Sequence, residues 1–205
     1  MAVEVPRLVV VADVDAAGGE AAWLRVLQRL GNLRLGTACA VQVRAKGRDG
    51  QALRTLARRA RTAVADLRLV LNGPARLARD LGYTGVHWPE SEVPPQVPPE
   101  ASELLRSASA HSPAALRRAD AVAHCVLFGP VFPPGSKEGA GVGVEALRGA
   151  CRLSRLPVLA VGGITLDRVG ACLEAGAWGV AVVTAVVRSP DPAAALLDFA
   201  ARLAA

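Results

Sequence analysis

Short, uninterrupted apolar runs alternate along the chain with longer segments in which apolar residues recur every three or four positions. An uninterrupted run is typical of a parallel strand covered on both faces, and the wider spacing is typical of a helix packed on one side. The first run, LVVVA at residues 8–12, precedes a predicted helix over residues 20–30 that Gly31 would end. The pattern therefore predicts strands and helices in alternation.

Eight strands are predicted, over residues 8–12, 38–44, 67–71, 84–88, 104–109, 121–128, 157–161 and 179–183. Helices are predicted over residues 20–30, from Lys46 to about residue 65, over 74–80, from residues 113 and 144, and over 166–175 and 191–203. Residues 89–99 are rich in proline and cannot form a regular helix. Eight alternating units favour an α/β fold, a single (β/α)8 TIM barrel spanning residues 1–205, with an open doubly wound sheet as the alternative.

Composition supports one large core and excludes several classes of protein. Hydrophobic residues make up 52% of the chain and aromatic residues only 3%, so Ala, Val and Leu must build the core. No uncharged apolar stretch approaches the length of a membrane span, so we expect a cytoplasmic protein without a membrane partner. The four cysteines show no CxxC pair and no histidine at metal-ligand spacing, which predicts small buried thiols.

The formal net charge is +6, and the densest basic run is RTLARRAR at residues 54–61. A nucleic-acid binder would gather its charge in a stripe with interleaved aromatic residues. Here the arginines lie at helical spacing beside apolar positions, which predicts a solvated helix face and no nucleic-acid partner. The positive balance could still attract phosphorylated anions.

In a TIM barrel the functional groups lie in the loops that follow the strands. Polar residues gather at the predicted ends of strands two to five, namely Gln42, Arg44, Lys46, Asn72, His87, Ser107, Ser109 and His111. Ser136 and Lys137 follow the sixth strand in a glycine-rich loop, where Lys137 could serve a mobile lid over an anion. This concentration predicts a binding site at the carboxyl ends of the strands.

Gly162 and Gly163 follow the seventh strand, and Val183 and Thr184 follow the eighth. Glycines let the backbone approach an anion closely, and amides at a helix start favour negative charge. We therefore expect a small phosphorylated ligand there, with a tight strand-to-helix turn as the purely structural alternative. Arg44 and Lys46 add two cations on one side of a strand end.

His87 and His111 fall at or just after strand ends, where either could move a proton near neutral pH. Each could equally be structural, His87 inside the barrel and His111 at a helix start. His124 lies at the start of the sixth strand, away from the site, and is expected to be structural. A magnesium site would need oxygen ligands from several strand ends, and the third strand ends in Asn72-Gly73 without a carboxylate.

Motifs along nearly the whole chain resemble the superfamily of thiamine phosphate synthases and TenI-type thiazole tautomerases. They are VQVRAKG, LVLNGPARLA, GVHWPE, SASAHSP, VLFGPVFPPGSKEG, LPVLAVGGIT and GVAVVTAV. The resemblance implies a TIM barrel acting on a thiazole phosphate in thiamine biosynthesis. It also leaves open a homodimer, because small barrels often pair.

Within the superfamily, the synthase couples a pyrimidine diphosphate to a thiazole phosphate with magnesium. Its pattern has Asn-Asp after the third strand and Gln-x-Asp after the fourth, whereas this chain has Asn72-Gly73 and only Glu92 as a replacement carboxylate. In the sixth loop, Pro134 and Ser136 stand where the synthase commonly has threonines. These departures disfavour magnesium-diphosphate chemistry.

The Asn-Gly pair and the proline in the fourth loop are similar to the tautomerase branch, which shifts a proton on a thiazole carboxylate phosphate without a metal cofactor. Some members place a histidine in the sixth loop, where this chain has Pro130. The resemblance thus implies a tautomerase in which His111, with His87 as its rival and Ser109 beside them, moves the proton. The alternatives are a divergent magnesium-dependent synthase using Glu92 and a non-catalytic sensor of the same ligand.

Overall fold

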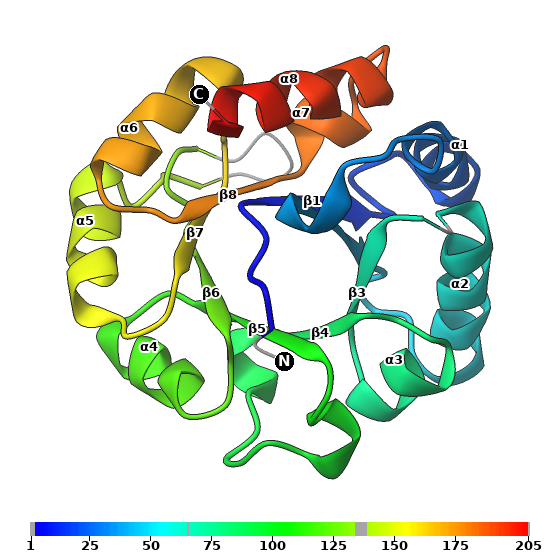
Figure 1. Cartoon of the computed structure of the whole chain (residues 1–205), viewed down its shortest axis with the longest axis horizontal. Helices are drawn as coiled ribbons and strands as arrows, with labels where there is room; N and C mark the ends of the chain where they lie inside the picture. Colours follow the sequence, from blue (N-terminus) through cyan, green and yellow to red (C-terminus); the bar gives the residue numbers. More distant parts are fainter. Residues whose placement is uncertain (1–2, 65, 134–138, 205) are drawn as a thin grey trace.

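A computed structural model describes residues 3–64, 66–133 and 139–204 of the chain. Eight parallel strands close into a barrel in sequence order, β1 pairing with β8, and helices surround it (Figure 1). The strands are β1 (Leu8–Asp13), β2 (Cys39–Arg44), β3 (Arg68–Asn72), β4 (Gly85–Trp88), β5 (Leu105–Ala110), β6 (Cys125–Phe128), β7 (Val158–Val161) and β8 (Gly179–Val182). The TIM barrel predicted from the strand count is therefore confirmed, and the open sheet is wrong.

The surrounding helices are α1 (Glu20–Leu30), α2 (Gly50–Ala63), α3 (Ala75–Asp80), α4 (Pro113–Asp120), α5 (Val144–Leu153), α6 (Val169–Glu174), α7 (Thr184–Val187) and α8 (Pro192–Ala204). Most predicted boundaries differ from these by one or two residues. The sixth strand is shorter than predicted, because the backbone N–H groups of Val122 and Ala123 bond back to Ala119 and continue the turn after α4. The proline-rich segment contains two 3-10 turns, Glu90–Glu92 and Pro99–Ala101. The short helix α7 was not predicted.

The core has an outer layer between strands and helices and a smaller layer inside the barrel. Since side chains alternate between the two faces of a strand, every second residue of each strand enters the interior. On β2 this alternation runs Ala40, Gln42, Arg44, from apolar to charged toward the carboxyl end. The polar end of the interior is therefore the end where the strands stop.

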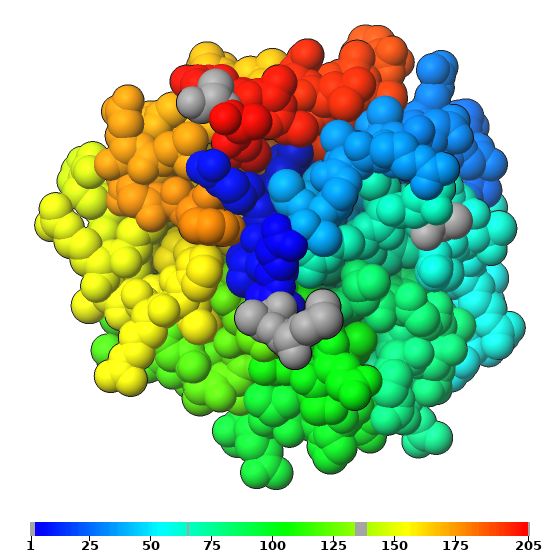
Figure 2. Space-filling model, in the orientation of Figure 1, coloured from blue at the N-terminus to red at the C-terminus, as the bar shows by residue number. Residues whose placement is uncertain are grey.

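The opposite end of the barrel is closed by the N-terminal segment, which crosses the middle of the face seen in Figure 2. Val3 and Val5 pack against Ala40, Val70 and Leu105, which belong to β2, β3 and β5. The backbone carbonyl of Val5 also accepts a hydrogen bond from the Trp178 indole at 3.3 Å. The segment thus plugs the floor, and ligands have access at the other end.

Replacing Val5 by aspartate is expected to lower the free energy of unfolding by about 2 kcal/mol, because an unpaired carboxylate would enter an apolar layer. Urea unfolding followed by circular dichroism measures the effect. Val142, whose side chain is 48% exposed, provides the matched control. If Val5→Asp and Val142→Asp cost the same, the segment does not plug the barrel.

The structure also places the cysteines and the arginine-rich run. Cys39, Cys125 and Cys172 are buried free thiols, whereas Cys151 is only half-buried. The arginine-rich run at residues 54–61 belongs to α2, whose buried face is made of leucine and alanine. None of the helices in the described ranges is long and apolar enough to cross a membrane.

Candidate active site

A cavity of about 390 Å³ opens at the carboxyl ends of the strands. The sequence-predicted residues that line it are Gln42, Arg44, Lys46, Asn72, His87, Ser109, His111, Gly162 and Val183. Gly163 and Thr184 adjoin two of these residues but are not among the cavity lining that the structure describes. Ser136 and Lys137 lie outside the described residues. One cavity thus gathers most of the predicted site.

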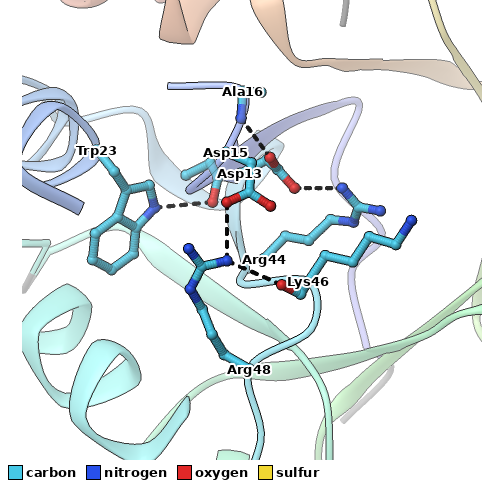
Figure 3. Close-up of polar contacts among 8 residues, drawn as sticks. Asp13, Asp15, Ala16, Trp23, Arg44, Lys46 and Arg48 are labelled. Atoms are coloured by element: carbon cyan, nitrogen blue, oxygen red, sulfur yellow. Dashed lines mark hydrogen bonds and ion pairs between the residues drawn. The ribbon is translucent and has the colours of Figure 1, made fainter. Parts of the chain in front are cut away.

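One wall comes from the ends of β1 and β2, which the barrel register pairs at Asp13 and Arg44. Arg44 donates a hydrogen bond to Asp13 Oδ2, and the backbone N–H of Ala16 donates to Oδ1 at 2.7 Å (Figure 3). The Trp23 indole anchors the same turn by donating to the carbonyl of Ala12 at 3.0 Å. The buried Asp13 carboxylate therefore holds the Arg44 guanidinium at the cavity wall.

A second ion pair lies at the rim of this wall. Arg48 donates to Asp15 Oδ1 at 2.9 Å and to the carbonyl of Lys46 at 3.0 Å (Figure 3). Asp15 lines the cavity together with Lys46, and Lys46 is exposed there. The two acidic side chains each have an arginine partner, which leaves Lys46 to add positive charge at the mouth.

Arg188, which was not predicted, lines the same cavity from the segment that follows α7. Its Nε atom donates to the carbonyl of Ala16 at 2.8 Å, which ties the loop after β8 to the loop after β1. The only signal in the sequence was an arginine shortly after the eighth strand. The cavity wall therefore carries cations from β2 and from the α7 region, which suits an anionic ligand.

The opposite wall holds His87, on β4, between two serines of β5. His87 Nδ1 lies 2.9 Å from Ser107 Oγ, and Nε2 lies 2.9 Å from Ser109 Oγ. Burial lowers the pKa of His87 to about 3, and the nearby Arg44 acts in the same direction. At neutral pH the His87 ring is therefore uncharged.

The free energy of unfolding should fall as the pH drops below the ordinary histidine pKa of about 6.5, because His87 then binds a proton in the unfolded chain but stays neutral in the folded protein. The contribution is fully present above pH 6.5 and is lost progressively toward pH 3, at up to about 1.4 kcal/mol per pH unit. Urea unfolding at pH 7.5 and 5.5 measures it. His87→Gln should flatten this dependence and His111→Gln should preserve it; equal slopes for both variants would contradict the assignment.

His111 is hydrogen-bonded to Glu90 from the loop after β4. Glu90 Oε2 accepts from the His111 ring at Nδ1 (2.7 Å) and from the His111 backbone N–H (2.8 Å), and Arg118 donates to Oε1 at 3.3 Å. Partial burial acts to raise the pKa of Glu90, but the bonds from His111 and the charge of Arg118 outweigh it, so this pKa is lowered. Glu90 is thus held as a carboxylate that orients His111, with Nε2 left for a ligand. Neither the pairing nor its orientation was predicted.

Gln42 lies at the floor of the cavity and is 2% exposed. Within the described structure its Oε1 atom is buried and has no hydrogen-bond partner. Leaving a buried acceptor unsatisfied is costly. A ligand that donates a hydrogen bond here would remove that cost.

Gly162 contributes to the far wall, where the loop after β6 packs on it. Its φ of +95° is a conformation that favours glycine, and a Cβ atom there would lie 2.4 Å from the Cβ of Pro130. Phe132 extends the contact by donating its backbone N–H to the carbonyl of Gly162 at 3.1 Å. The glycine therefore brings two loops into close contact at the edge of the cavity.

A second cavity of about 470 Å³ adjoins the first and shares Arg44, Lys46 and Asn72 with it. Glu92 lines this second cavity and not the first. His124, by contrast, lies near the barrel floor, where its ring contacts Arg106 at 2.8 Å. The structural role predicted for His124 agrees with that position.

The carboxylates near the site do not form a magnesium cage. Asp13, Asp15 and Glu90 each have basic partners, and Asp49 and Glu92 line the second cavity instead of the first. Among the residues that the structure describes, no three His, Cys, Asp or Glu side chains are placed to hold a metal ion. The described residues therefore do not fit a resident magnesium ion.

The closed parallel barrel makes this a TIM-barrel protein. The positively charged cavity lies at the strand ends, where enzymes of this fold have their active sites, and it suits a small anion. Comparison with known proteins shows that the chain belongs to the thiamine monophosphate synthase (TMP-TENI) family, whose model matches residues 8–186. The resemblance seen in the sequence is thereby confirmed at the level of the family.

Individual relatives extend this result. The chain is 30% identical over 196 residues to the thiamine-phosphate synthase of Koribacter versatilis, covering 91% of this chain and 92% of the relative. It is 37% identical over 165 residues to the thiamine-phosphate synthase of Rhizobium etli, covering 75% and 79%. A thiamine phosphate pyrophosphorylase from Pyrococcus furiosus shares the fold, with a TM-score of 0.78 at 24% identity over 97% of this chain and 95% of that one. The names of the two relatives place the family in thiamine biosynthesis and give no specific support to the tautomerase branch.

Proposed function

We propose that the chain binds a thiazole phosphate in the first cavity and moves a proton on it without a resident metal, as a thiazole tautomerase. The observation that carries the proposal is the Glu90–His111 pair at the cavity, because a carboxylate that accepts from Nδ1 leaves Nε2 to act as acid or base. An isomerisation needs only such a group and a held substrate. The base that removes the proton can return it at another position.

The rest of the cavity supports binding of an anion. Arg44, Lys46 and Arg188 supply positive charge, and the backbone around Gly162 and Val183 lines the side expected to take the phosphate. Gly163, Thr184, Ser136 and Lys137 remain proposed contacts for that ligand. His87 is the rival proton carrier, but burial lowers its pKa to about 3, which makes it a poor base at neutral pH.

The second candidate is the coupling of a pyrimidine diphosphate to a thiazole phosphate. Two observations favour it: the relatives' names, which support it better than the tautomerase, and the adjoining second cavity, which offers room for a second substrate. Against it stands the lack of fit of the described residues to magnesium, for which Glu92 is the proposed ligand and Asp49 is a second carboxylate in the same cavity. No step of the proposed proton transfer depends on that metal.

One experiment separates these functions. Purified protein is supplied with the thiazole carboxylate phosphate tautomer, and separately with this ligand plus the pyrimidine diphosphate, each with magnesium and with a chelator. Products are followed by mass and absorbance. Aromatisation that persists in chelator supports the tautomerase, magnesium-dependent coupling supports the synthase, and tight binding without product overturns both in favour of a sensor.

Replacing Gln42 by leucine should weaken binding of the thiazole phosphate while leaving the empty protein as stable as before or more so. The ligand loses an acceptor worth about tenfold in affinity, whereas the empty protein loses a buried, unsatisfied atom. Calorimetric titration and urea unfolding measure the two effects. Gln28→Leu, outside the cavity, is the control; weaker binding together with an equal loss of stability would contradict this role.

A further inference from the structure

The His87 ring joins two serine hydroxyls that have different surroundings. Ser107 is 5% exposed and faces the inside of the barrel, whereas Ser109 lines the cavity. The register of β4 and β5 sets His87 beside Ser107, and Ser109 follows two residues later on the same side of the strand. The three side chains therefore form a short hydrogen-bonded chain from the interior to the ligand.

Ser107, the innermost of the three residues, sets the direction of the hydrogen bonds in the series. Ser107 has one hydroxyl hydrogen, and the geometry directs it to the backbone carbonyl of Val86, 3.3 Å away, which can only accept. The Ser107 oxygen is then left to accept a hydrogen bond, and His87 Nδ1 at 2.9 Å must supply it.

A neutral imidazole carries one N–H, so protonation of Nδ1 leaves Nε2 as an acceptor. Ser109 Oγ, 2.9 Å from Nε2, then donates its hydrogen to the ring. With that hydrogen committed, Ser109 can offer only oxygen lone pairs to the cavity. The reverse order of protons would make Ser109 a donor instead.

We propose that Ser107 is a positioning residue that fixes the Nδ1–H tautomer of His87 and thereby presents Ser109 to the ligand as a hydrogen-bond acceptor. The group of the ligand that meets Ser109 must accordingly be a donor, such as an N–H or a hydroxyl. This inference rests on the proposed function only for the identity of the ligand. Its first test uses the ligand-free protein.

Long-range ¹H–¹⁵N correlation spectra of the uniformly labelled, full-length protein report which ring nitrogen of each histidine carries the proton. The chain contains 3 histidines, so spectra of His111→Gln and His124→Asn identify the signal of His87. At neutral pH we expect His87 to show a protonated Nδ1 and an unprotonated Nε2. A protonated Nε2 would overturn the proposal, whatever reaction the protein catalyses.

Variants then separate positioning from simple packing. Ser107→Ala should convert His87 to a mixture of tautomers, and Ser107→Thr, which keeps the hydroxyl, should restore the Nδ1–H form. Ser109→Ala is the matched control, because it removes the partner of Nε2 and leaves the Ser107 bond intact. If Ser107→Ala keeps the tautomer as pure as in the parent protein, Ser107 does not position the ring.

Discussion

Replacing His111 by glutamine is expected to lower turnover of the thiazole phosphate by about 10²–10⁴-fold, the usual contribution of a general acid or base. The reason is geometric, since Glu90 holds Nδ1 at 2.7 Å and His111 lines the cavity. Glutamine retains polarity and approximate size but cannot carry a proton. Steady-state kinetics measure the loss, and calorimetric titration should show that the ligand still binds.

Two further variants sharpen this test. Glu90→Gln leaves the histidine in place without its orienting charge, so we expect a smaller loss of turnover than for His111→Gln. His124→Asn removes a histidine near the barrel floor and should leave turnover unchanged. Full activity of His111→Gln would show that another residue transfers the proton. A His87 variant would then be tested by the same measurement.

The fold could be predicted from the sequence because its barrel repeats one simple rule eight times. Most strands contain a short apolar run, and polar residues such as Gln42 and Arg44 stand toward the strand end, where alternation directs every second side chain inward. The cavity was predicted for the same reason. Strand ends of a barrel meet at one mouth, so polar residues remote in sequence converge there.

What the sequence could not predict depends on contacts between loops. Glu90 meets His111 from the loop of a neighbouring strand, and Arg188 reaches Ala16 across the join between β8 and β1. Neither contact leaves a periodic signal. The short helix α7 was missed because its sequence, TAVV, is mostly apolar and continues the pattern of the strand before it.

The role of a carboxylate also could not be predicted, because it depends on the partners that the fold brings to it. Asp13 lies at a strand end, where a carboxylate can serve as a metal ligand, but its oxygens accept from Arg44 and from the Ala16 backbone. A carboxylate that is already paired with an arginine is poorly placed to hold a cation. The ion pair therefore converts an acidic strand end into support for an anion site.

Removing one member of that pair should be costly. The Asp13 side chain is 5% exposed, so Arg44→Met would leave a buried carboxylate without its counter-charge. Breaking a buried pair typically costs about 3–5 kcal/mol, and the partial exposure of Arg44 reduces our expectation to about 2–3 kcal/mol. Urea unfolding measures the loss, and Arg48→Met, at the more exposed pair with Asp15, should cost less than about 1 kcal/mol.

The double variant Asp13→Asn, Arg44→Met distinguishes the pair from the packing of its members. Asparagine keeps an oxygen that can accept from the Ala16 backbone N–H but carries no charge, so most of the stability lost in Arg44→Met should return. Affinity for the phosphorylated ligand should stay low, because the cation is still absent from the cavity. Recovery of stability without recovery of affinity would show that Asp13 serves to hold Arg44 for the anion; a double variant as unstable as Arg44→Met would show that packing of the arginine, and not its charge, stabilises this wall.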